Sequence, residues 1–84
     1  MRIDDLDFDF AKINAEIRDE IQEGRERFGD FRSFHEAYAV LLEEVDEVWA
    51  RIKAKDHSDG LRHDLTQVAA ITARILLEFE RLAV

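Results

Sequence analysis

The sequence predicts an all-α protein with three helices, the last two forming a long antiparallel helical hairpin. The 84 residues include no proline and three glycines, so long stretches are free of residues that interrupt helices. Apolar residues recur at steps of three and four, the period of a helix that buries one face. With no linker and no internal repeat, a chain of this length is expected to form a single domain, residues 1–84.

The first predicted helix covers residues 8–27. Four apolar residues share one of its faces: Phe10, Ile13, Ile17 and Ile21. Aspartates precede it, where negative charge suits the positive end of a helix dipole: Asp4, Asp5, Asp7 and Asp9. Gly24 is expected to fray or end this helix, because glycine is the weakest helix former after proline.

The second predicted helix covers residues 33–54 and has the strongest pattern in the chain. Ser33 followed by Glu36 is a capping box, in which each side chain bonds the free backbone N–H of the other residue. A continuous apolar seam follows at helical spacing: Phe34, Tyr38, Leu41, Val45, Val48 and Ile52. Leu42 and Trp49 widen this seam.

The third predicted helix begins at Ser58 or Gly60 and ends at Leu82. Its seam repeats the same spacing: Leu61, Leu65, Val68, Thr72, Ile75, Phe79 and Leu82. Because only a short polar turn separates the two long seams, they are expected to pair antiparallel as a hairpin. Further apolar residues flank both seams, so one hairpin cannot cover them all, and we expect a homo-oligomer in which a second copy covers the rest.

Charge and composition limit the possible partners. The formal net charge is −8, from 20 acidic and 12 basic side chains, which disfavours binding to nucleic acid. No apolar run is long enough to span a membrane, and the chain contains no cysteine, so a cytoplasmic protein is expected. An acidic protein that handles phosphates usually does so through a divalent cation.

An acidic strip follows one side of the second predicted helix. Glu43 and Glu47 lie on this side, Glu36 precedes them by two turns, and Glu44 lies between the strip and the apolar seam. Like charges four residues apart cost a few tenths of a kcal/mol per pair. Arg51 can pair with Glu47, four residues before it. The strip is either a solvated acidic face, as composition alone favours, or part of a binding site.

A carboxylate on the third predicted helix favours the binding site. Asp64 lies within the apolar arc of that helix, where a charge is costly to bury without a partner. Across a turn near residue 57, the offset between Asp64 and Glu47 is only a few ångströms at ~1.5 Å per residue. Glu44, Glu47 and Asp64 can therefore converge, and such oxygen ligands suit Mg²⁺ or Mn²⁺. Alternatively, Asp64 leans toward solvent or Arg62.

Residues 31–80 resemble the MazG-like all-α nucleoside triphosphate pyrophosphohydrolases. The first metal motif of that family is Glu-Glu-x-x-Glu on a helix, which Glu43, Glu44 and Glu47 match in full. The second, Glu-x-x-Asp on the next helix, is degenerate here, because Asp64 replaces the glutamate and Gln67 the aspartate. Without the resemblance, Gln67 is interpreted as a polar residue at the edge of the apolar arc of the third predicted helix.

The resemblance implies Mg²⁺-dependent cleavage of a nucleoside triphosphate to the monophosphate and pyrophosphate, in a homodimer or homotetramer. Glu43, Glu44, Glu47 and Asp64 would be metal ligands, and Glu44 and Glu47 the catalytic carboxylates. Gln67 removes a charge from the site, so two alternatives remain open. Besides the active enzyme, these are a catalytically impaired relative that binds nucleotide or metal, and a helical interaction module with an acidic surface.

Overall fold

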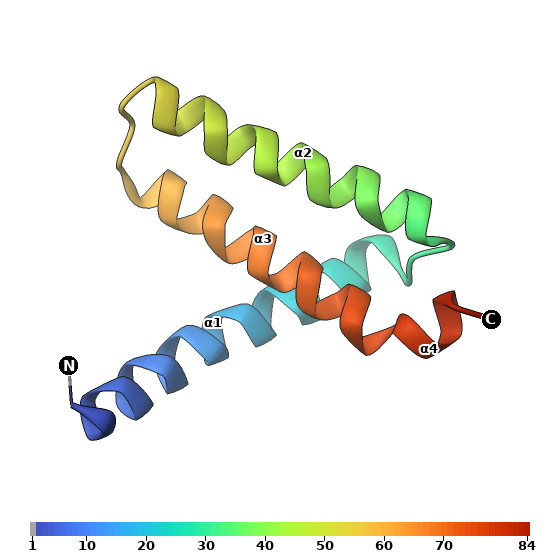
Figure 1. Cartoon of the computed structure of the whole chain (residues 1–84), viewed down its shortest axis with the longest axis horizontal. Helices are drawn as coiled ribbons and strands as arrows, with labels where there is room; N and C mark the ends of the chain where they lie inside the picture. The colour runs from blue at the N-terminus through green and yellow to red at the C-terminus, as the bar shows by residue number, and fades with distance from the viewer. Residues whose placement is uncertain (1) are drawn as a thin grey trace.

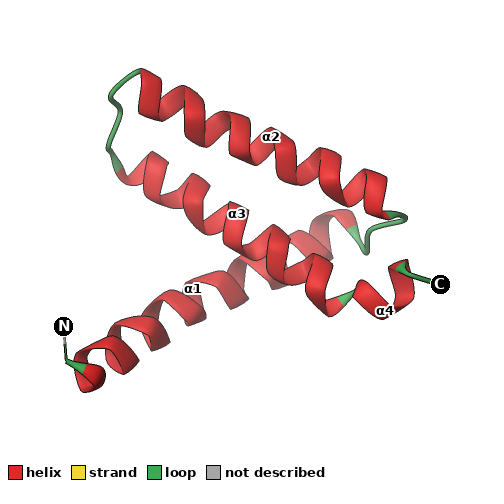
Figure 2. Ribbon diagram, in the orientation of Figure 1, coloured by secondary structure: helices red, strands yellow, loops and turns green. Residues whose placement is uncertain are grey.

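The structure, a computed structural model, describes residues 2–84, and of these it leaves only the side chains of Ile3 and Asp4 undescribed. The described chain is all-α and contains no strand, which confirms the all-α part of the prediction. Four helices follow one another, as Figures 1 and 2 show: α1 (Ile3–Phe28), α2 (Phe34–Lys53), α3 (Asp59–Leu77) and α4 (Phe79–Leu82).

Helix α3 is the centre of the arrangement because it packs against both α1 and α2. In Figure 1, α2 and α3 lie side by side, while α1 crosses α3 at a steep angle and its N-terminal part projects away from the other helices. No helix in the described part of the chain is both long enough and apolar enough to cross a membrane.

The ends of α1 differ from the prediction. The helix begins at Ile3 rather than near residue 8, so the aspartates of this region lie inside its first turns instead of ahead of it. Gly24 does not end the helix, which continues for another turn to Phe28. Gly29 ends it instead, with a φ of 72° that favours glycine, and its N–H donates to the Arg25 carbonyl.

The start of α2 carries the predicted cap in modified form. The Ser33 hydroxyl accepts a hydrogen bond from the Glu36 N–H at 3.1 Å, as a capping box requires. The Glu36 carboxylate, however, accepts from the N–H of Arg32 at 3.3 Å rather than from that of Ser33. The reciprocal half of the box is therefore shifted by one residue.

The third predicted helix is divided at Glu78, between α3 and α4. Glu78 is 5% exposed, and its carboxylate accepts hydrogen bonds from the Phe31 N–H at 2.8 Å and from Arg81 at 2.6 Å. Arg74, also buried, donates to the Gly29 carbonyl at 2.6 Å and lies over the Phe31 ring. These contacts tie residues 29–31 to the C-terminal end of the chain.

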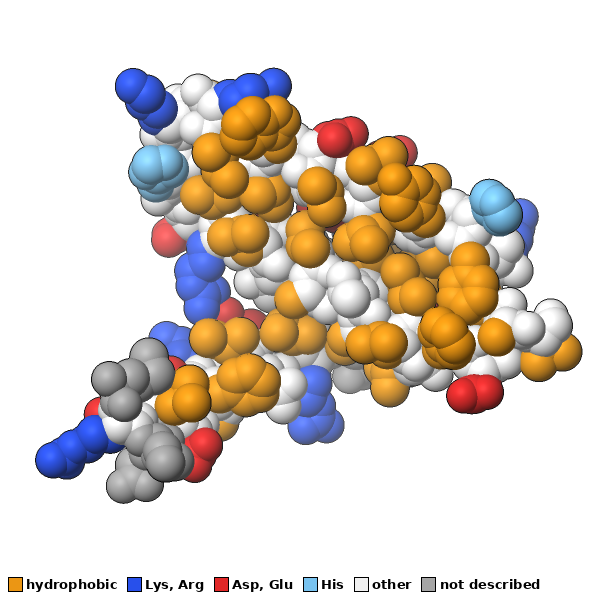
Figure 3. Space-filling model, viewed as in Figure 1, with side chains coloured by type: hydrophobic (Ala, Val, Ile, Leu, Met, Phe, Trp, Pro, Cys, Tyr) orange, Lys and Arg blue, Asp and Glu red, His pale blue; other side chains and the backbone are white. Residues whose placement is uncertain are grey.

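The core is small, and the predicted seam of α2 faces it only in part. The buried apolar residues of the described chain are Phe31, Ala37, Ala70 and Ile71. Tyr38 and Trp49, predicted to be in or beside the seam, are 61% and 55% exposed. Figure 3 accordingly shows apolar side chains spread over one face of the molecule.

Candidate metal centre

Three carboxylates from two helices converge in the structure. Glu44 and Glu47 of α2 and Asp64 of α3 each place an oxygen within 4.8 Å of the others. Ala37, Glu44 and Arg51 follow one another at seven-residue intervals, so they share the side of α2 that faces α3. Since Ala37 packs in the core and Arg51 reaches Asp64, Glu44 is held between α2 and α3.

The three carboxyl groups have unequal environments. Asp64 is 6% exposed, Glu44 is partly buried and Glu47 is exposed. The Oε2 atom of Glu44 is buried and has no hydrogen-bond partner. Burial raises the pKa of Glu44 to about 7, and the negative charges of Glu47 and Asp64 add to this effect. Glu44 therefore exchanges its proton near neutral pH.

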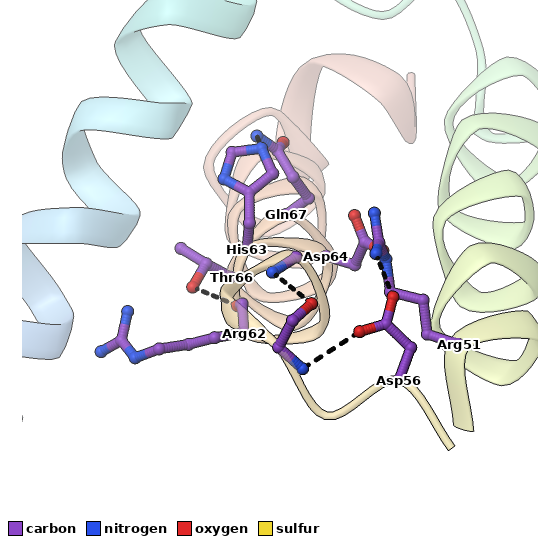
Figure 4. A network of polar contacts seen from close by, with 9 residues as sticks. Arg51, Asp56, Arg62, His63, Asp64, Thr66 and Gln67 are labelled. Carbon is purple, nitrogen blue, oxygen red and sulfur yellow. Dashed lines mark hydrogen bonds and ion pairs between the residues drawn. The ribbon is translucent and has the colours of Figure 1, made fainter. Parts of the chain in front are cut away.

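Arg51 supplies a positive charge at the edge of the cluster. Its Nε donates to Asp64 Oδ2 at 2.5 Å and its Nη1 donates to Asp56 Oδ2 at 2.8 Å, so the guanidinium lies between the two carboxylates (Figure 4). A Cβ at position 60 would collide with this guanidinium, so Gly60 leaves the space that Arg51 fills. The expected pairings of Arg51 with Glu47 and of Asp64 with Arg62 are not the ones that the structure forms.

Helix α1 contributes polar groups next to the cluster. Arg62 extends toward α1 (Figure 4) and pairs with Glu16 at 2.5 Å, which lowers the pKa of the Glu16 carboxyl. The amide of Gln67 donates a hydrogen bond to the Glu20 carboxylate, and His63 Nδ1 lies 3.9 Å from the same carboxylate. Gln67 is thus bonded to α1 and is not one of the three converging groups.

Glu43 stands apart from the converging groups. It is exposed, and it is not among the three residues whose oxygens approach one another. A rotation of about 100° per residue places it further around α2 than Glu44, away from α3. Of the four ligands that the resemblance implies, the structure therefore brings three together.

Three residues next to the cluster, Arg51, Glu20 and Gly60, are not assigned to a site by the sequence pattern. Arg51 was expected to act on Glu47, because the helical i,i+4 rule considers neighbours on one helix only. Glu20 lies on the first helix, whose crossing with the third carries no signature in the sequence. Gly60 offered one signal, since a glycine in the first turn of a helix can mark the close approach of another side chain.

The donor set fits a divalent cation. Carboxylate oxygens are the ligands that Mg²⁺ and Mn²⁺ prefer, and both ions retain waters where the protein supplies few ligands. The buried Oε2 of Glu44, which has no partner in the described chain, is an acceptor that a cation would satisfy. Glu47, being exposed, leaves the cluster open to solvent on one side.

Comparisons with protein-family models, with curated proteins and with solved structures gave no match for the chain. The resemblance to the MazG-like pyrophosphohydrolases thus stays a prediction from the acidic motif of α2 and from Asp64.

Proposed function

We propose that this chain is a cytoplasmic, Mg²⁺-dependent nucleoside triphosphate pyrophosphohydrolase that forms the monophosphate and pyrophosphate. The observation that carries the proposal is the convergence of Glu44, Glu47 and Asp64 within 4.8 Å, with a buried oxygen of Glu44 lacking a partner. A structural helix seldom holds a carboxylate in this way, because a buried acceptor without a partner costs about 1–3 kcal/mol. A partly buried carboxyl group with a raised pKa, such as Glu44, is typical of functional sites.

The carboxylates would have separate roles. Glu44, Glu47 and Asp64 would hold the cation, which would neutralise phosphate charge and lower the pKa of a water molecule. The pKa of about 7 belongs to Glu44 in the metal-free protein, and a bound cation would lower it, so Glu44 would act as a ligand in its ionised form. Glu47 is exposed and would face the triphosphate. Arg51 pairs with Asp64 at 2.5 Å and holds its carboxylate in place.

A specific observation favours a second candidate function. Gln67 takes the place of a family ligand, and its amide bonds Glu20 rather than a group of the cluster. Asp64 already has a positively charged partner, because the guanidinium of Arg51 donates a hydrogen bond to one of its oxygens. A site with one carboxylate fewer and a resident guanidinium would bind metal and nucleotide weakly, as in a sensor or an interaction module that lacks turnover.

Pyrophosphate release tests the first candidate. The wild-type protein is incubated with a panel of ribo- and deoxynucleoside triphosphates, first with Mg²⁺ and then with Mn²⁺. We expect release with at least one substrate and its loss in Glu44→Gln, which keeps the shape of the side chain but removes its charge. Asp46→Asn is the matched control, because Asp46 is exposed on the same helix and outside the cluster.

Glu43→Gln separates the geometry from the resemblance. The geometry predicts that this variant retains release, whereas the family motif predicts its loss. If no substrate is cleaved but Mn²⁺ still binds the wild type and not Glu44→Gln, the second candidate function replaces the first. If Mn²⁺ does not bind at all, the acidic strip is only a solvated surface.

A further inference from the structure

We propose that Arg51 binds the triphosphate group of the substrate, an assignment that rests on the first candidate function above. The guanidinium lies at the edge of the carboxylate cluster (Figure 4), and the Arg51 side chain is 38% exposed. Arg51 follows Glu44 by seven residues and Glu47 by four, so these side chains share one side of α2. Arg51 and a bound cation would have Asp64 as a common partner, so the guanidinium would lie beside the phosphates that the cation holds.

The charge of the cluster explains why a basic side chain is needed beside the metal. Three ionised carboxylates outweigh the two positive charges of one Mg²⁺, so the cluster would still repel a polyanion after the metal has bound. The net charge of −8 on the whole chain adds to this repulsion. One further positive charge offsets the excess, and the guanidinium of Arg51 supplies it through a direct contact with Asp64.

The other basic side chains near the cluster have partners on α1. Arg62 pairs with Glu16, and His63 lies next to the carboxylate of Glu20. Neither of these contacts involves a carboxylate of the cluster. Among the described residues, Arg51 is therefore the basic side chain that bonds a member of the cluster.

The guanidinium of Arg51 has hydrogen-bond donors to spare. It carries five N–H groups in a planar fork, a geometry that matches phosphate oxygens. Nε donates to Asp64 and Nη1 donates to Asp56, whereas Nη2 has no hydrogen-bond partner in the described chain. The two anchors hold the guanidinium in position before a ligand arrives, which lowers the entropic cost of binding. Nη2 is then the donor that remains for a phosphate oxygen.

Separate measurements of metal and phosphate binding test this assignment. Mn²⁺ binding is followed by the paramagnetic resonance signal of the free ion, and binding of inorganic tripolyphosphate by calorimetry on the Mn²⁺-loaded protein. We expect Arg51→Gln to bind Mn²⁺ at least as tightly as wild type. It should bind tripolyphosphate at least about tenfold more weakly, because a charged hydrogen bond is lost. Arg51→Lys keeps the charge but not the planar fork, so its affinity for tripolyphosphate should lie between the two.

Two control variants separate phosphate binding from a purely structural role. Arg62→Gln removes the same charge from a residue that pairs with Glu16, so it should bind Mn²⁺ and tripolyphosphate like wild type. Asp56→Asn removes one anchor of Arg51 but leaves the guanidinium bonded to Asp64, so it should keep its affinity for tripolyphosphate. If Arg51 only fastens the turn between α2 and α3, Asp56→Asn should weaken the binding of both ligands, as Arg51→Gln would. If Arg51→Gln does not fold, Arg51→Lys and Asp56→Asn decide between the two roles.

The outcomes distinguish this inference from the proposed function. Equal affinity for tripolyphosphate in wild type and Arg51→Gln, with Mn²⁺ bound by both, overturns the assignment of Arg51 but leaves the proposed function standing. Parallel loss of Mn²⁺ and tripolyphosphate binding in Arg51→Gln and Asp56→Asn overturns the assignment in favour of a structural role. A wild-type protein that binds no Mn²⁺ contradicts the proposed function itself, and the inference fails with it.

Discussion

Replacing Glu44 by glutamine should stabilise the metal-free protein at alkaline pH and leave it unchanged at acidic pH. The folded structure raises the pKa of this carboxyl from 4.5 to about 7, chiefly through burial. A folded-state pKa above the unfolded value means that the folded protein binds more protons between these limits. Stability therefore falls as pH rises from about 4.5 to about 7, and the full loss is present above that window.

The size of the effect follows from the shift in pKa. The difference between a pKa of 4.5 and one of about 7 corresponds to about 3 kcal/mol. Glu44 is only partly buried, so screening by solvent reduces this figure to about 1–2 kcal/mol. A glutamine at this position does not ionise, so we expect the Glu44→Gln variant to melt about 5–12 °C above wild type at pH 8. Near pH 5 the two proteins should melt together.

Thermal melting from pH 5 to pH 8, at one fixed protein concentration, measures this difference. Asp46→Asn is the control for the loss of one negative charge, and we expect it to stay within about 0.5 kcal/mol of wild type at every pH. Mg²⁺ at ten times its Kd should stabilise the wild type by about 1.4 kcal/mol and leave Glu44→Gln unaffected. Parallel pH profiles for wild type and Glu44→Gln would refute the assignment of a raised pKa to this residue.

Two further substitutions test other parts of the structure. Glu78→Gln leaves Arg74 buried without its carboxylate partner, so we expect the free energy of unfolding, measured in urea, to fall by about 3 kcal/mol. A fall of less than about 1 kcal/mol would show that the contact between Arg74 and Glu78 does not hold the fold together. Arg51→Gln removes the cation that occupies Asp64, so the metal-free protein should be destabilised while Mn²⁺ raises its melting temperature more than that of wild type. Arg62→Gln is the matched control, because Arg62 pairs with Glu16 instead of Asp64. An equal rise in melting temperature with Mn²⁺ in wild type and Arg51→Gln would argue against competition between Arg51 and the metal for Asp64.

Much of the fold could be predicted because the relevant signals are local. The period of apolar residues marked each long helix. Ser33 marked the start of α2, because its hydroxyl bonds the N–H of Glu36, only three residues further along the chain. The break at Glu78 could not be predicted in this way. At this break Glu78 accepts a hydrogen bond from the N–H of Phe31, 47 residues away in sequence, and no local propensity encodes that contact.

The candidate site was predictable where helical geometry alone sets position. Spacing along α2 and the turn length were enough to bring Glu44, Glu47 and Asp64 together. The pattern was a poor guide to orientation, because it predicts that the seam through Tyr38 faces α3, whereas Glu44 and Arg51 lie on that side. Apolar periodicity marks a face that a helix can bury, but it does not identify the element that this face contacts.

The contacts of residues 29–31 with the C-terminal part of the chain also have a consequence for the order of folding. Arg74 bonds Gly29 across 45 residues, Glu78 bonds Phe31 across 47, and Arg81 bonds the Phe31 carbonyl across 50. The ion pair between Arg51 and Asp64 spans 13 residues, so the loop that it closes costs less entropy. We therefore expect α2 and α3 to associate early and α1 to dock last, when the segment that follows it is fastened. The carboxylate cluster of α2 and α3 would therefore form before α1 packs against α3.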